Sequence, residues 1–566
     1  MQMADVVTHQ ITGQTCVITI DNPPENVIGH AVRAGLIVAL DAAEAAGADR
    51  IVITGAGKVF VAGADAKEFG AAPVAPHLSD ILQRLERLPA IAAINGAALG
   101  GGLEIALACH YRIASTRAVL GLPEVTLGVV PGAGGTQRLP RLIGLEAAVS
   151  LIAEGRSVTS AEALALGLVD AVADDPLAAA FALPAKALRD HPALCDRPAP
   201  LPAPDAVMAA RKAAQKRMPG QIAPLRAIDL VAQTASLPLA EGLAAERATF
   251  LALRQSEQAT ALRHVFFAER AATGRGKRLQ GAGDIRQAVV VGGGNMGAGI
   301  AYALAGVGIA VTLVETSAEA ATRARANIAG LYADAVKRGK TTADNASADQ
   351  SRLFDFVTGY GALPAADIAI EAAFEDMAVK KTIFAALDAG LPETTILATN
   401  TSYLDVNAIF EGLRSPSRCL GLHFFSPAHV MKLLEVIRAK TTSEATLATA
   451  FGLADRLRKI PVEAGVCDGF IGNRILTRYR QTTDVLLIEG ALPAEVDAAL
   501  EGFGMAMGPY AVQDLSGLDI AYANRQRKGL RHRSDIRYVP IADQMVEGLK
   551  RLGRKTKAGW YDYPEG

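Results

Sequence analysis

The sequence predicts a multidomain α/β protein in which two α/β units are each followed by a helical region. Its 566 residues exceed the roughly 250 to 300 residues at which one hydrophobic core stops growing, so we expect two to four domains. Between residues 15 and 170, apolar strand-like segments such as TCVITI and RIVITG alternate with helical segments. A second pattern of strand, glycine turn, helix and strand opens at QAVVVGGG.

Composition and charge narrow the class of function. Hydrophobic residues make up 50% of the chain and charged residues 20%, which is typical of a globular protein with a sizeable core. With 57 Lys and Arg against 58 Asp and Glu, the formal net charge is -1. This balance provides no bulk attraction to nucleic acid or to an anionic membrane, so we expect neither as a partner.

The cysteines and the ends of the sequence indicate a cytoplasmic protein. The five cysteines form neither CxxC pairs nor clusters with histidine, which predicts reduced thiols and no metal site. We expect no secretory or peroxisomal signal in MQMADVVTHQ or YDYPEG. Residues 288–314 carry no charge and are long enough to cross a bilayer, but their glycine punctuation favours strand, turn, helix and strand over a transmembrane segment.

Two helical regions separate and follow the α/β units. Pro and Ala punctuation in RPAPLPAPD, residues 197–205, ends the first unit, and residues 206–280 have apolar residues at roughly helical spacing. This stretch is expected to be either a connector or a packed helical lid. Beyond residue 465 the sequence is largely helical again. The predicted segments are residues 1–196, 197–284, 285–468 and 469–566.

The first glycine run, LGGGLE, lies between a strand-like IAAI and a helix-like GLEIALA. Backbone N–H groups gather at such a helix N-terminus and favour negative charge. On its own, the run could equally be a tight turn in which Glu104 suits the helix dipole. Glu124, in GLPEV, offers a second carboxylate twenty residues later, and two carboxylates that converge on one pocket suit proton transfer to and from a substrate.

The order AGAD, GGGLE, GLPEV and PGAGGTQRLPRLIG resembles the enoyl-CoA hydratase, or crotonase, family across roughly the first 180 residues. The resemblance implies a superhelix of ββα turns that binds an acyl-CoA thioester. It implies that the backbone N–H groups of Ala64 and Gly101 form an oxyanion hole, that Glu104 activates water and that Glu124 serves the α-proton. Isomerisation of the double bond in the same site is an additional expectation.

The second glycine run, VGGGNMG, fits the dinucleotide-binding pattern G-x-G-x-x-G through Gly292, Gly294 and Gly297. The pattern is weak alone and could mark a plain tight turn, but here a strand precedes it, a helix follows, and a second strand ends in Glu315. An acid at that place binds the ribose diol and repels a 2′-phosphate. The run therefore predicts a Rossmann domain that binds NAD rather than NADP.

Residues 285–563 resemble the 3-hydroxyacyl-CoA dehydrogenases through VGGGNMG, EAAFEDMAVKK, NTSY, GLHFFSP, KLLEV, GFIGNR, MGPY and KTKAGWYDY. The resemblance implies that His423 removes the 3-hydroxyl proton and that Glu435 supports its imidazole. It also implies that Ser402 and Asn473 act near the reacting oxygen and that Glu375 and Lys380 lie near the cofactor. His429, in the neighbouring SPAHV, is predicted to be structural.

The order of the two units resembles the bifunctional enzymes of fatty-acid β-oxidation. The resemblance implies hydration of trans-2-enoyl-CoA followed by NAD-dependent oxidation of the (3S)-3-hydroxyacyl-CoA, with a thiolase as a candidate partner. The sequence stops before the second helical domain usual in that family, so we expect either a shortened chain or another subunit that supplies the missing cover. A monomer or a homodimer is expected. Two alternatives stay open: an assembly subunit that binds CoA without turnover, and the same chemistry in the breakdown of aromatic or short acyl chains.

Overall fold

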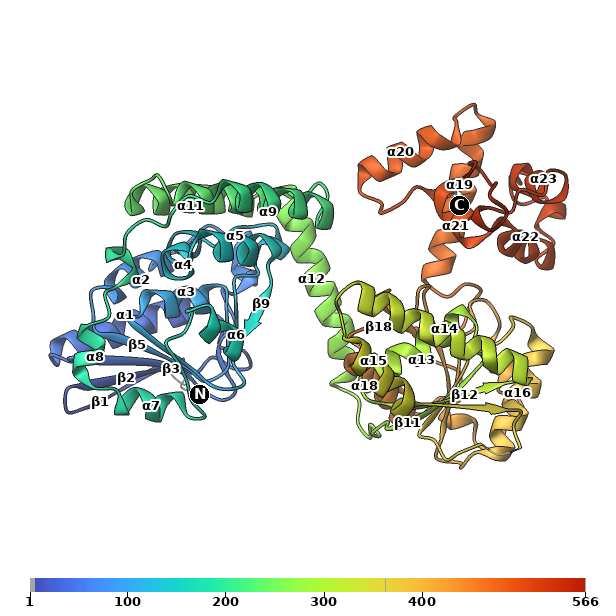
Figure 1. The fold of residues 1–566 in the computed structure, drawn as a ribbon, viewed down its shortest axis with the longest axis horizontal. Coiled ribbons are helices and arrows are strands. Elements are labelled where there is room, and N and C mark those ends of the chain that lie inside the picture. Colours follow the sequence, from blue (N-terminus) through green and yellow to red (C-terminus); the bar gives the residue numbers. More distant parts are fainter. Residues whose placement is uncertain (1–5, 362, 565–566) are drawn as a thin grey trace. The chain divides into compact units, whose positions relative to one another are not determined.

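A computed structural model describes residues 6–361 and 363–564 of the chain. The chain forms two compact units, Met1–Phe267 and Ala268–Gly566. In Figure 1 the first unit runs from blue to green and the second from green to red. Each unit has its own sheets and its own hydrophobic core.

The larger sheet of the first unit has six strands in the order β1-β2-β3-β5-β7-β10. β1 and β2 are antiparallel, and the remaining neighbours are parallel. β3 and β5 are almost wholly buried, as expected for parallel strands covered on both faces. The strands are β1 (Val7–Thr12), β2 (Thr15–Ile20), β3 (Arg50–Gly55), β5 (Ala90–Ile94), β7 (Tyr111–Ala114) and β10 (Ala171–Val172).

A smaller sheet of four strands, in the order β4-β6-β8-β9, carries the loops of the first candidate site. Its first three strands are parallel, so their carboxyl ends lie at one edge of the sheet. Loops at the carboxyl ends of parallel strands are the usual place for ligands in α/β proteins. The strands are β4 (Val59–Val61), β6 (Ala97–Leu99), β8 (Val119–Gly121) and β9 (Ser157–Thr159).

Helices and short 3₁₀ turns connect these strands and complete the crotonase-like part of the unit. The helices are α1 (His30–Ala45), α2 (Leu78–Leu85), α3 (Gly101–Ala108), α4 (Gly135–Ile143), α5 (Leu145–Glu154), α6 (Ser160–Ala165), α7 (Pro176–Ala182) and α8 (Ala185–Arg189). The 3₁₀ turns are η1 (Ala66–Gly70), η2 (Glu124–Leu127) and η3 (Leu194–Asp196).

The predicted helical stretch after residue 206 is confirmed, with short breaks. It comprises α9 (Pro204–Arg217), α10 (Ala223–Gln233), α11 (Leu239–Arg254) and α12 (Glu257–Gly276). α9 packs on α5, α10 packs on both α4 and α5, and α11 packs on α4. The expectation that this stretch packs on the first unit is therefore right for α9 to α11 (Figure 1). In α10, for example, Ile228, Leu230 and Val231 are buried in the core of the first unit.

The second unit contains one sheet of eight strands, in the order β13-β12-β11-β14-β15-β16-β17-β18. Its first six strands follow the 3-2-1-4-5-6 order of a Rossmann fold, which confirms the predicted fold class. Only β16 and β17 are antiparallel among the neighbours of this sheet. The strands are β11 (Gln287–Val291), β12 (Ala310–Glu315), β13 (Phe354–Thr358), β14 (Ile368–Glu371), β15 (Ile396–Thr399), β16 (Cys419–Phe424), β17 (Leu433–Ile437) and β18 (Ile460–Ala464).

Helices surround this sheet, and the residues after it are helical, as predicted. Those of the sheet region are α13 (Asn295–Ala305), α14 (Ala318–Lys337), α15 (Ala343–Leu353), α16 (Met377–Gly390), α17 (Val406–Ile409), η4 (Pro416–Arg418) and α18 (Glu444–Arg456). The following ones are α19 (Gly472–Ile488), α20 (Pro493–Phe503), α21 (Pro509–Ser516), α22 (Leu518–Arg527), η5 (Leu530–His532), α23 (Ile541–Glu547) and η6 (Arg554–Thr556).

The uncharged segment 288–314 lies in β11, α13 and β12, as its glycine punctuation predicts. Across the described part of the chain, none of the helices has both the length and the apolar character needed to cross a membrane.

Candidate active sites

Three neighbouring strands of the small sheet lead into the residues of the first predicted site. Ala64 follows β4, Gly101 follows β6 and begins α3, and Glu124 follows β8. The register of the parallel strands sets Leu99 beside Gly121, so the loops that follow β6 and β8 leave the sheet together. The structure thus brings together four residues that lie between positions 64 and 124 of the sequence: Ala64, Gly101, Glu104 and Glu124.

Two backbone N–H groups in this site have no partner. Neither Ala64 nor Gly101 donates a backbone hydrogen bond to any residue in the described ranges. They are close neighbours, since a Cβ placed on Gly101 would lie 3.8 Å from the backbone nitrogen of Ala64. Two adjacent unpaired donors, one of them at the N-terminus of α3, can stabilise a negatively charged oxygen.

Glu104 lies in the first turn of α3 and is only 3% exposed. Its Oε1 accepts hydrogen bonds from the backbone N–H groups of Ala133 and Gly135, at 2.8 and 2.9 Å. Burial raises the pKa of this carboxyl, although the two N–H donors act in the opposite direction. Both bonds go to Oε1, which leaves Oε2 without a hydrogen bond to the described residues and able to act on a water molecule.

Glu124 opens the 3₁₀ turn η2, and its carboxyl lies against Gly100. Gly100 has a φ of +51°, and a Cβ there would lie 3.0 Å from Oε1 of Glu124, so only glycine fits. Oε2 of Glu124 is buried and has no hydrogen-bond partner among the described residues. Burial, and then the charge of Glu104, raise the pKa of Glu124 well above its usual value. A neutral carboxyl of this kind can donate a proton.

A third buried carboxylate, which the sequence analysis missed, belongs to Glu246 of α11. It is 1% exposed and accepts hydrogen bonds from Gly134 and Thr136, at the N-terminus of α4. No motif marks it, because it lies in a helix whose apolar spacing indicates only packing. Its contacts with α4 join residues 110 and 112 positions apart in the sequence, which no local pattern can reveal.

The glycine turn after β11 has the form that a pyrophosphate needs. Gly292 has a φ of +92°, and a Cβ on Gly297 would lie 1.7 Å from the carbonyl oxygen of Gly292. Gly294 caps α13 without any side-chain hydrogen bond, which leaves the first N–H groups of this helix open to an anion. Glu315 ends β12, and its Oε1 accepts the N–H of Gly293 at 2.5 Å. The carboxylate therefore lies beside the glycine turn, where a ribose diol would bind.

The predicted histidine and its carboxylate meet across two strands. His423 on β16 pairs directly with Glu435 on β17, and Nδ1 of His423 lies 2.6 Å from Oε2 of Glu435. The other oxygen of Glu435 accepts the N–H groups of Ile471 and Gly472, at 2.9 and 2.7 Å. Burial alone would raise the pKa of Glu435, but the hydrogen bonds from His423 and Gly472 outweigh it and lower the pKa. Glu435 thus stays ionised beside the imidazole.

Backbone contacts anchor the segments that carry the other two predicted residues to the strands of His423 and Glu435. Asn473 directly follows Gly472, whose N–H binds Glu435, in the first turn of α19. Ser402 lies in the loop after β15, and Asn400 ties the start of that loop to β16 because its Oδ1 accepts the N–H of Phe424 at 2.8 Å. The loop with Ser402 and the start of α19 with Asn473 are therefore both anchored to the pair of strands that carries His423.

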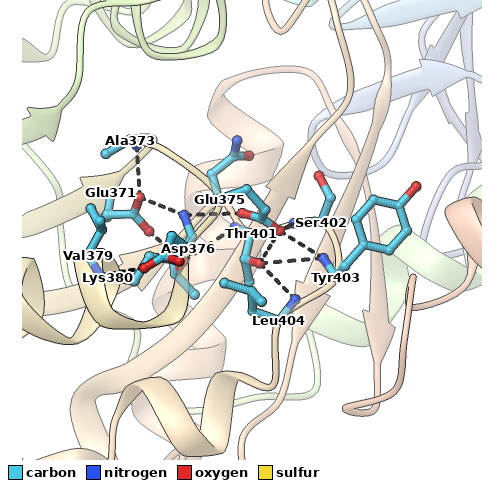
Figure 2. A network of polar contacts seen from close by, with 12 residues as sticks. Glu371, Ala373, Glu375, Asp376, Val379, Lys380, Thr401, Ser402, Tyr403 and Leu404 are labelled. Atoms are coloured by element: carbon cyan, nitrogen blue, oxygen red, sulfur yellow. Dashed lines mark hydrogen bonds and ion pairs between the residues drawn. The ribbon is translucent and has the colours of Figure 1, made fainter. Parts of the chain in front are cut away.

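Glu375 and Lys380, predicted near the cofactor, belong to a network of polar contacts that reaches this loop (Figure 2). Nζ of Lys380 lies 2.7 Å from Oε1 of Glu371 and 3.3 Å from Oε2 of Glu375. Oε1 of Glu375 accepts the N–H of Ser402 at 2.9 Å and the hydroxyl of Thr401 at 2.6 Å. The network therefore holds the backbone that carries Ser402. Glu371 was missed, although an acid that ends the apolar strand IAIE was a usable signal.

Two further observations concern His429 and groups of possible metal ligands. The ring of His429 packs against Tyr302 at 5.5 Å between centroids, and its buried Nδ1 has no hydrogen-bond partner in the described chain. The structural role of His429 stays a prediction. Among the described residues, no group of three or more His, Cys, Asp or Glu side chains could hold a metal ion.

Comparisons with known proteins assign both units. Residues 10–192 match the family Enoyl-CoA hydratase/isomerase, residues 287–467 match the NAD binding domain of 3-hydroxyacyl-CoA dehydrogenase, and residues 469–563 match the C-terminal domain of that enzyme. The peroxisomal bifunctional enzyme of Cavia porcellus is 41% identical over 96% of this chain and 79% of its own length. The chain belongs to the bifunctional enoyl-CoA hydratase/3-hydroxyacyl-CoA dehydrogenase family.

Other relatives of this bifunctional family come from bacteria. The fatty acid oxidation complex subunit alpha of Psychrobacter arcticus is 35% identical over 91% of this chain and 75% of its own length. A solved structure, the (S)-3-hydroxybutyryl-CoA dehydrogenase of Ralstonia eutropha, matches 50% of this chain and all of its own at 34% identity, with a TM-score of 0.46.

The protein is therefore a bifunctional hydratase and dehydrogenase of fatty-acid β-oxidation, and its substrates are acyl-CoA thioesters. Its dehydrogenase uses NAD. The glycine turn fits this cofactor, because it combines the open N-terminus of α13 with a carboxylate at the end of β12.

Proposed function

We propose that the first unit hydrates trans-2-enoyl-CoA with Glu104 and Glu124 as its two proton-transfer groups. Addition of water to the conjugated double bond places negative charge on the thioester oxygen. The unpaired N–H groups of Ala64 and Gly101 are available for that oxygen, and one such donor is worth about 3 kcal/mol. Oε2 of Glu104 takes a proton from water, and the buried carboxyl of Glu124 gives one to the α-carbon.

We propose that the second unit oxidises the resulting (3S)-3-hydroxyacyl-CoA through His423. Bound NAD would supply the acceptor for the hydride that leaves carbon 3. The imidazole of His423 takes the hydroxyl proton, and Glu435 stabilises the cation that forms, because it is ionised and only 2.6 Å away. Ser402 and Asn473 hydrogen-bond to the reacting oxygen.

The remaining groups hold the cofactor or the loop beside it. Gly292, Gly294 and Gly297 would hold the pyrophosphate, and Glu315 would accept hydrogen bonds from the ribose. Glu375 and Lys380 hold the loop after β15 through the contacts drawn in Figure 2.

We also propose domain boundaries, a second activity of the first site and a location for the protein. We assign the four segments 1–196, 197–284, 285–468 and 469–566 to the hydratase core, the helical extension, the NAD-binding domain and the C-terminal dehydrogenase domain. Isomerisation of enoyl-CoA fits the first site, because it needs the same oxyanion hole and one proton-shuttling carboxyl. We place the protein in the cytoplasm, in keeping with its bacterial relatives.

We also propose that the C-terminal helices pair with a second copy of the chain. They expose large apolar side chains, with Ile475 and Ile520 at 66% and Phe503 at 84%, and extensive exposed apolar surface marks interaction sites. Light scattering should therefore give a dimer at micromolar concentration, and a strictly monomeric protein would contradict this. A thiolase is the candidate partner in an assembly, to be tested by co-purification.

One observation supports the proposed assignment, namely that the two sets of candidate catalytic groups lie in two separate compact units. Each set should therefore fail alone. Glu104→Gln or Glu124→Gln should slow the hydration of crotonyl-CoA by at least about 10²-fold, while oxidation of supplied 3-hydroxybutyryl-CoA continues. His423→Ala should do the reverse. Loss of hydration in a folded His423→Ala protein would show that the assignment to two sites is wrong.

A further inference from the structure

Four successive backbone N–H groups at the start of α4 are divided alternately between two buried carboxylates, those of Glu104 and Glu246. The donors, with their distances to the carboxylate oxygens, are Ala133 (2.8 Å) and Gly135 (2.9 Å) for Glu104, and Gly134 (2.5 Å) and Thr136 (2.8 Å) for Glu246. The Thr136 hydroxyl donates a third bond to Glu246, at 2.5 Å. The loop that holds Glu104 is thus itself held by Glu246.

The loop has no side chain of its own for this task. The residue that caps α4 is Gly134, which lacks a side-chain acceptor for the first N–H groups of the helix. No other residue fits there, because φ is +108° and a Cβ would lie 1.7 Å from Nη1 of Arg138. The carboxylate that caps α4 must therefore come from another element, and α11 supplies it.

Burial of the Glu246 carboxyl among other charged groups costs free energy of folding. The charges that act on it or that it acts on are Glu104 of α3, Glu124 of η2 and Arg138 of α4. Arg247, the next residue of α11, acts on Glu104. Arg138 is already paired with Glu86 at 2.7 Å. Burial, and then the charge of Glu104, raise the pKa of Glu246 to about 8. A buried carboxyl beside two others destabilises the fold, which argues for a functional role.

We propose that Glu246 is a positioning residue of the hydratase, which fixes the loop whose N–H groups aim the carboxylate of Glu104 at water. The helical extension thereby takes part in hydration without contacting the substrate. This inference rests on the proposed role of Glu104.

Glu246→Gln tests the positioning role while it keeps the size of the side chain. The amide oxygen can still accept one N–H of the loop, but the amide nitrogen then faces a second donor, so the loop must shift. A misplacement of about 1 Å can cost as much as about 10²-fold in rate. We expect kcat for crotonyl-CoA hydration to fall at least tenfold, KM to stay within threefold, and dehydrogenation to be unchanged. Glu241→Gln, an exposed glutamate of the same helix, is the matched control and should behave as wild type.

A double variant separates positioning from a general structural role. If Glu246 acts through Glu104, the fold-loss from Glu246→Gln should largely disappear in a Glu104→Gln background, because residues that act as one unit are not additive. In a Glu124→Gln background the loss should persist. Equal fold-losses in the wild-type and Glu104→Gln backgrounds, or a loss carried by KM alone, would overturn the proposal.

Thr136→Val provides a second test if Glu246→Gln fails to fold. It removes only the hydroxyl that binds Glu246 and keeps the backbone bond, so a smaller fall in kcat, about threefold to tenfold, is expected. Unchanged hydration in this variant would also count against the proposal. The outcomes for the two assignments differ. If Glu104→Gln does not slow hydration, the proposed base is wrong. If Glu104→Gln slows hydration but the changes at residues 246 and 136 have no effect, only the positioning role is wrong.

Discussion

His423 and Glu435 stand directly opposite each other on the antiparallel strands β16 and β17, and Nδ1 of the histidine lies 2.6 Å from Oε2 of the glutamate. The second oxygen of Glu435 accepts the N–H groups of Ile471 and Gly472 at the start of α19. The carboxylate therefore has two distinct ends. One end orients the imidazole, and the other fixes the helix that carries Asn473.

Glu435→Gln should disable oxidation without disturbing the fold. The two backbone donors require an oxygen at their end of the side chain, so the amide nitrogen must face His423 and donate to Nδ1. This forces the proton of the neutral imidazole onto Nε2, which then cannot accept the hydroxyl proton. The analogous change in a serine protease lowers kcat about 10⁴-fold.

We expect NADH formation from 3-hydroxybutyryl-CoA to fall at least about 10²-fold in this variant, with hydration near wild type. Glu444→Gln, an exposed glutamate at the start of α18, is the control. Oxidation at the rate of that control would mean that Glu435 does not set the tautomer.

Motifs predicted the residues that we propose to touch substrate, but not the residues that hold them. Glu104, Glu124 and His423 each lie in a short pattern beside a strand or a helix start, so the sequence could locate them. Glu246 could not be found in this way, because its partner Gly134 is 112 positions away and nothing in α11 distinguishes it from a solvent-facing glutamate. Support of this kind depends on tertiary packing, which a single sequence does not display.

Glu371 illustrates a different limit. It lies only nine residues before its partner Lys380, and it ends a buried apolar strand, so a local signal was present. The resemblance drew attention to Glu375 and Lys380 instead, because they were expected near the cofactor. The structure adds that Lys380 is 1% exposed and joins the two carboxylates, which makes the trio a single structural unit.

Lys380→Met should strongly destabilise the second unit. Removal of the ammonium leaves the carboxylate of Glu371, which is 0% exposed, without its counter-ion, and breaking a buried ion pair costs about 3–5 kcal/mol. Chemical denaturation of the full protein measures the effect, and oxidation should weaken as well because the loop with Ser402 loses its anchor.

Two further variants sharpen that test. Lys381→Met removes a neighbouring lysine whose side chain is 42% exposed and whose ion pair with Glu411 lies at the surface, so its cost should stay within about 1 kcal/mol. The double variant Glu371→Gln/Lys380→Met removes both buried charges and should recover part of the lost stability. Equal stability of Lys380→Met and Lys381→Met would show that the buried ion pair of Lys380 contributes little to the free energy of unfolding.

Glu315 should determine the choice between NAD and NADP. Its carboxylate lies beside the glycine turn, since Oε1 accepts the N–H of Gly293, and a negative charge there repels a 2′-phosphate. Glu315→Ala should raise the ratio of kcat/KM for NADP to that for NAD at least about tenfold, the worth of one hydrogen bond to a charged group. Glu319→Ala, at an exposed position in the next helix, should leave the ratio unchanged. A wild-type preference for NADP would contradict the assignment outright.

Glu124 should make the first unit less stable as the pH rises. Burial and the charge of Glu104 raise its pKa well above the usual value, so the folded state holds this proton over a pH range in which the unfolded chain has already released it. A group of this kind contributes stability that is fully present below the unfolded pKa, near 4.5, and is lost as the pH rises through the higher folded value.

The side chain of Glu124→Gln cannot ionise, so this variant does not lose stability in that way as the pH rises. Its stability relative to wild type should increase from pH 5 to pH 8, and each tenfold difference in proton affinity between the folded and unfolded states corresponds to about 1.4 kcal/mol. Calorimetric melting temperatures at both pH values measure the trend, with Glu146→Gln, an exposed glutamate of α5, as the control that should follow wild type. A constant difference between wild type and Glu124→Gln at the two pH values would show that Glu124 ionises as readily in the folded protein as in the unfolded chain. Its proposed role as a proton donor would then lose its physical basis, because a carboxyl that is already ionised at neutral pH has no proton to give to the α-carbon.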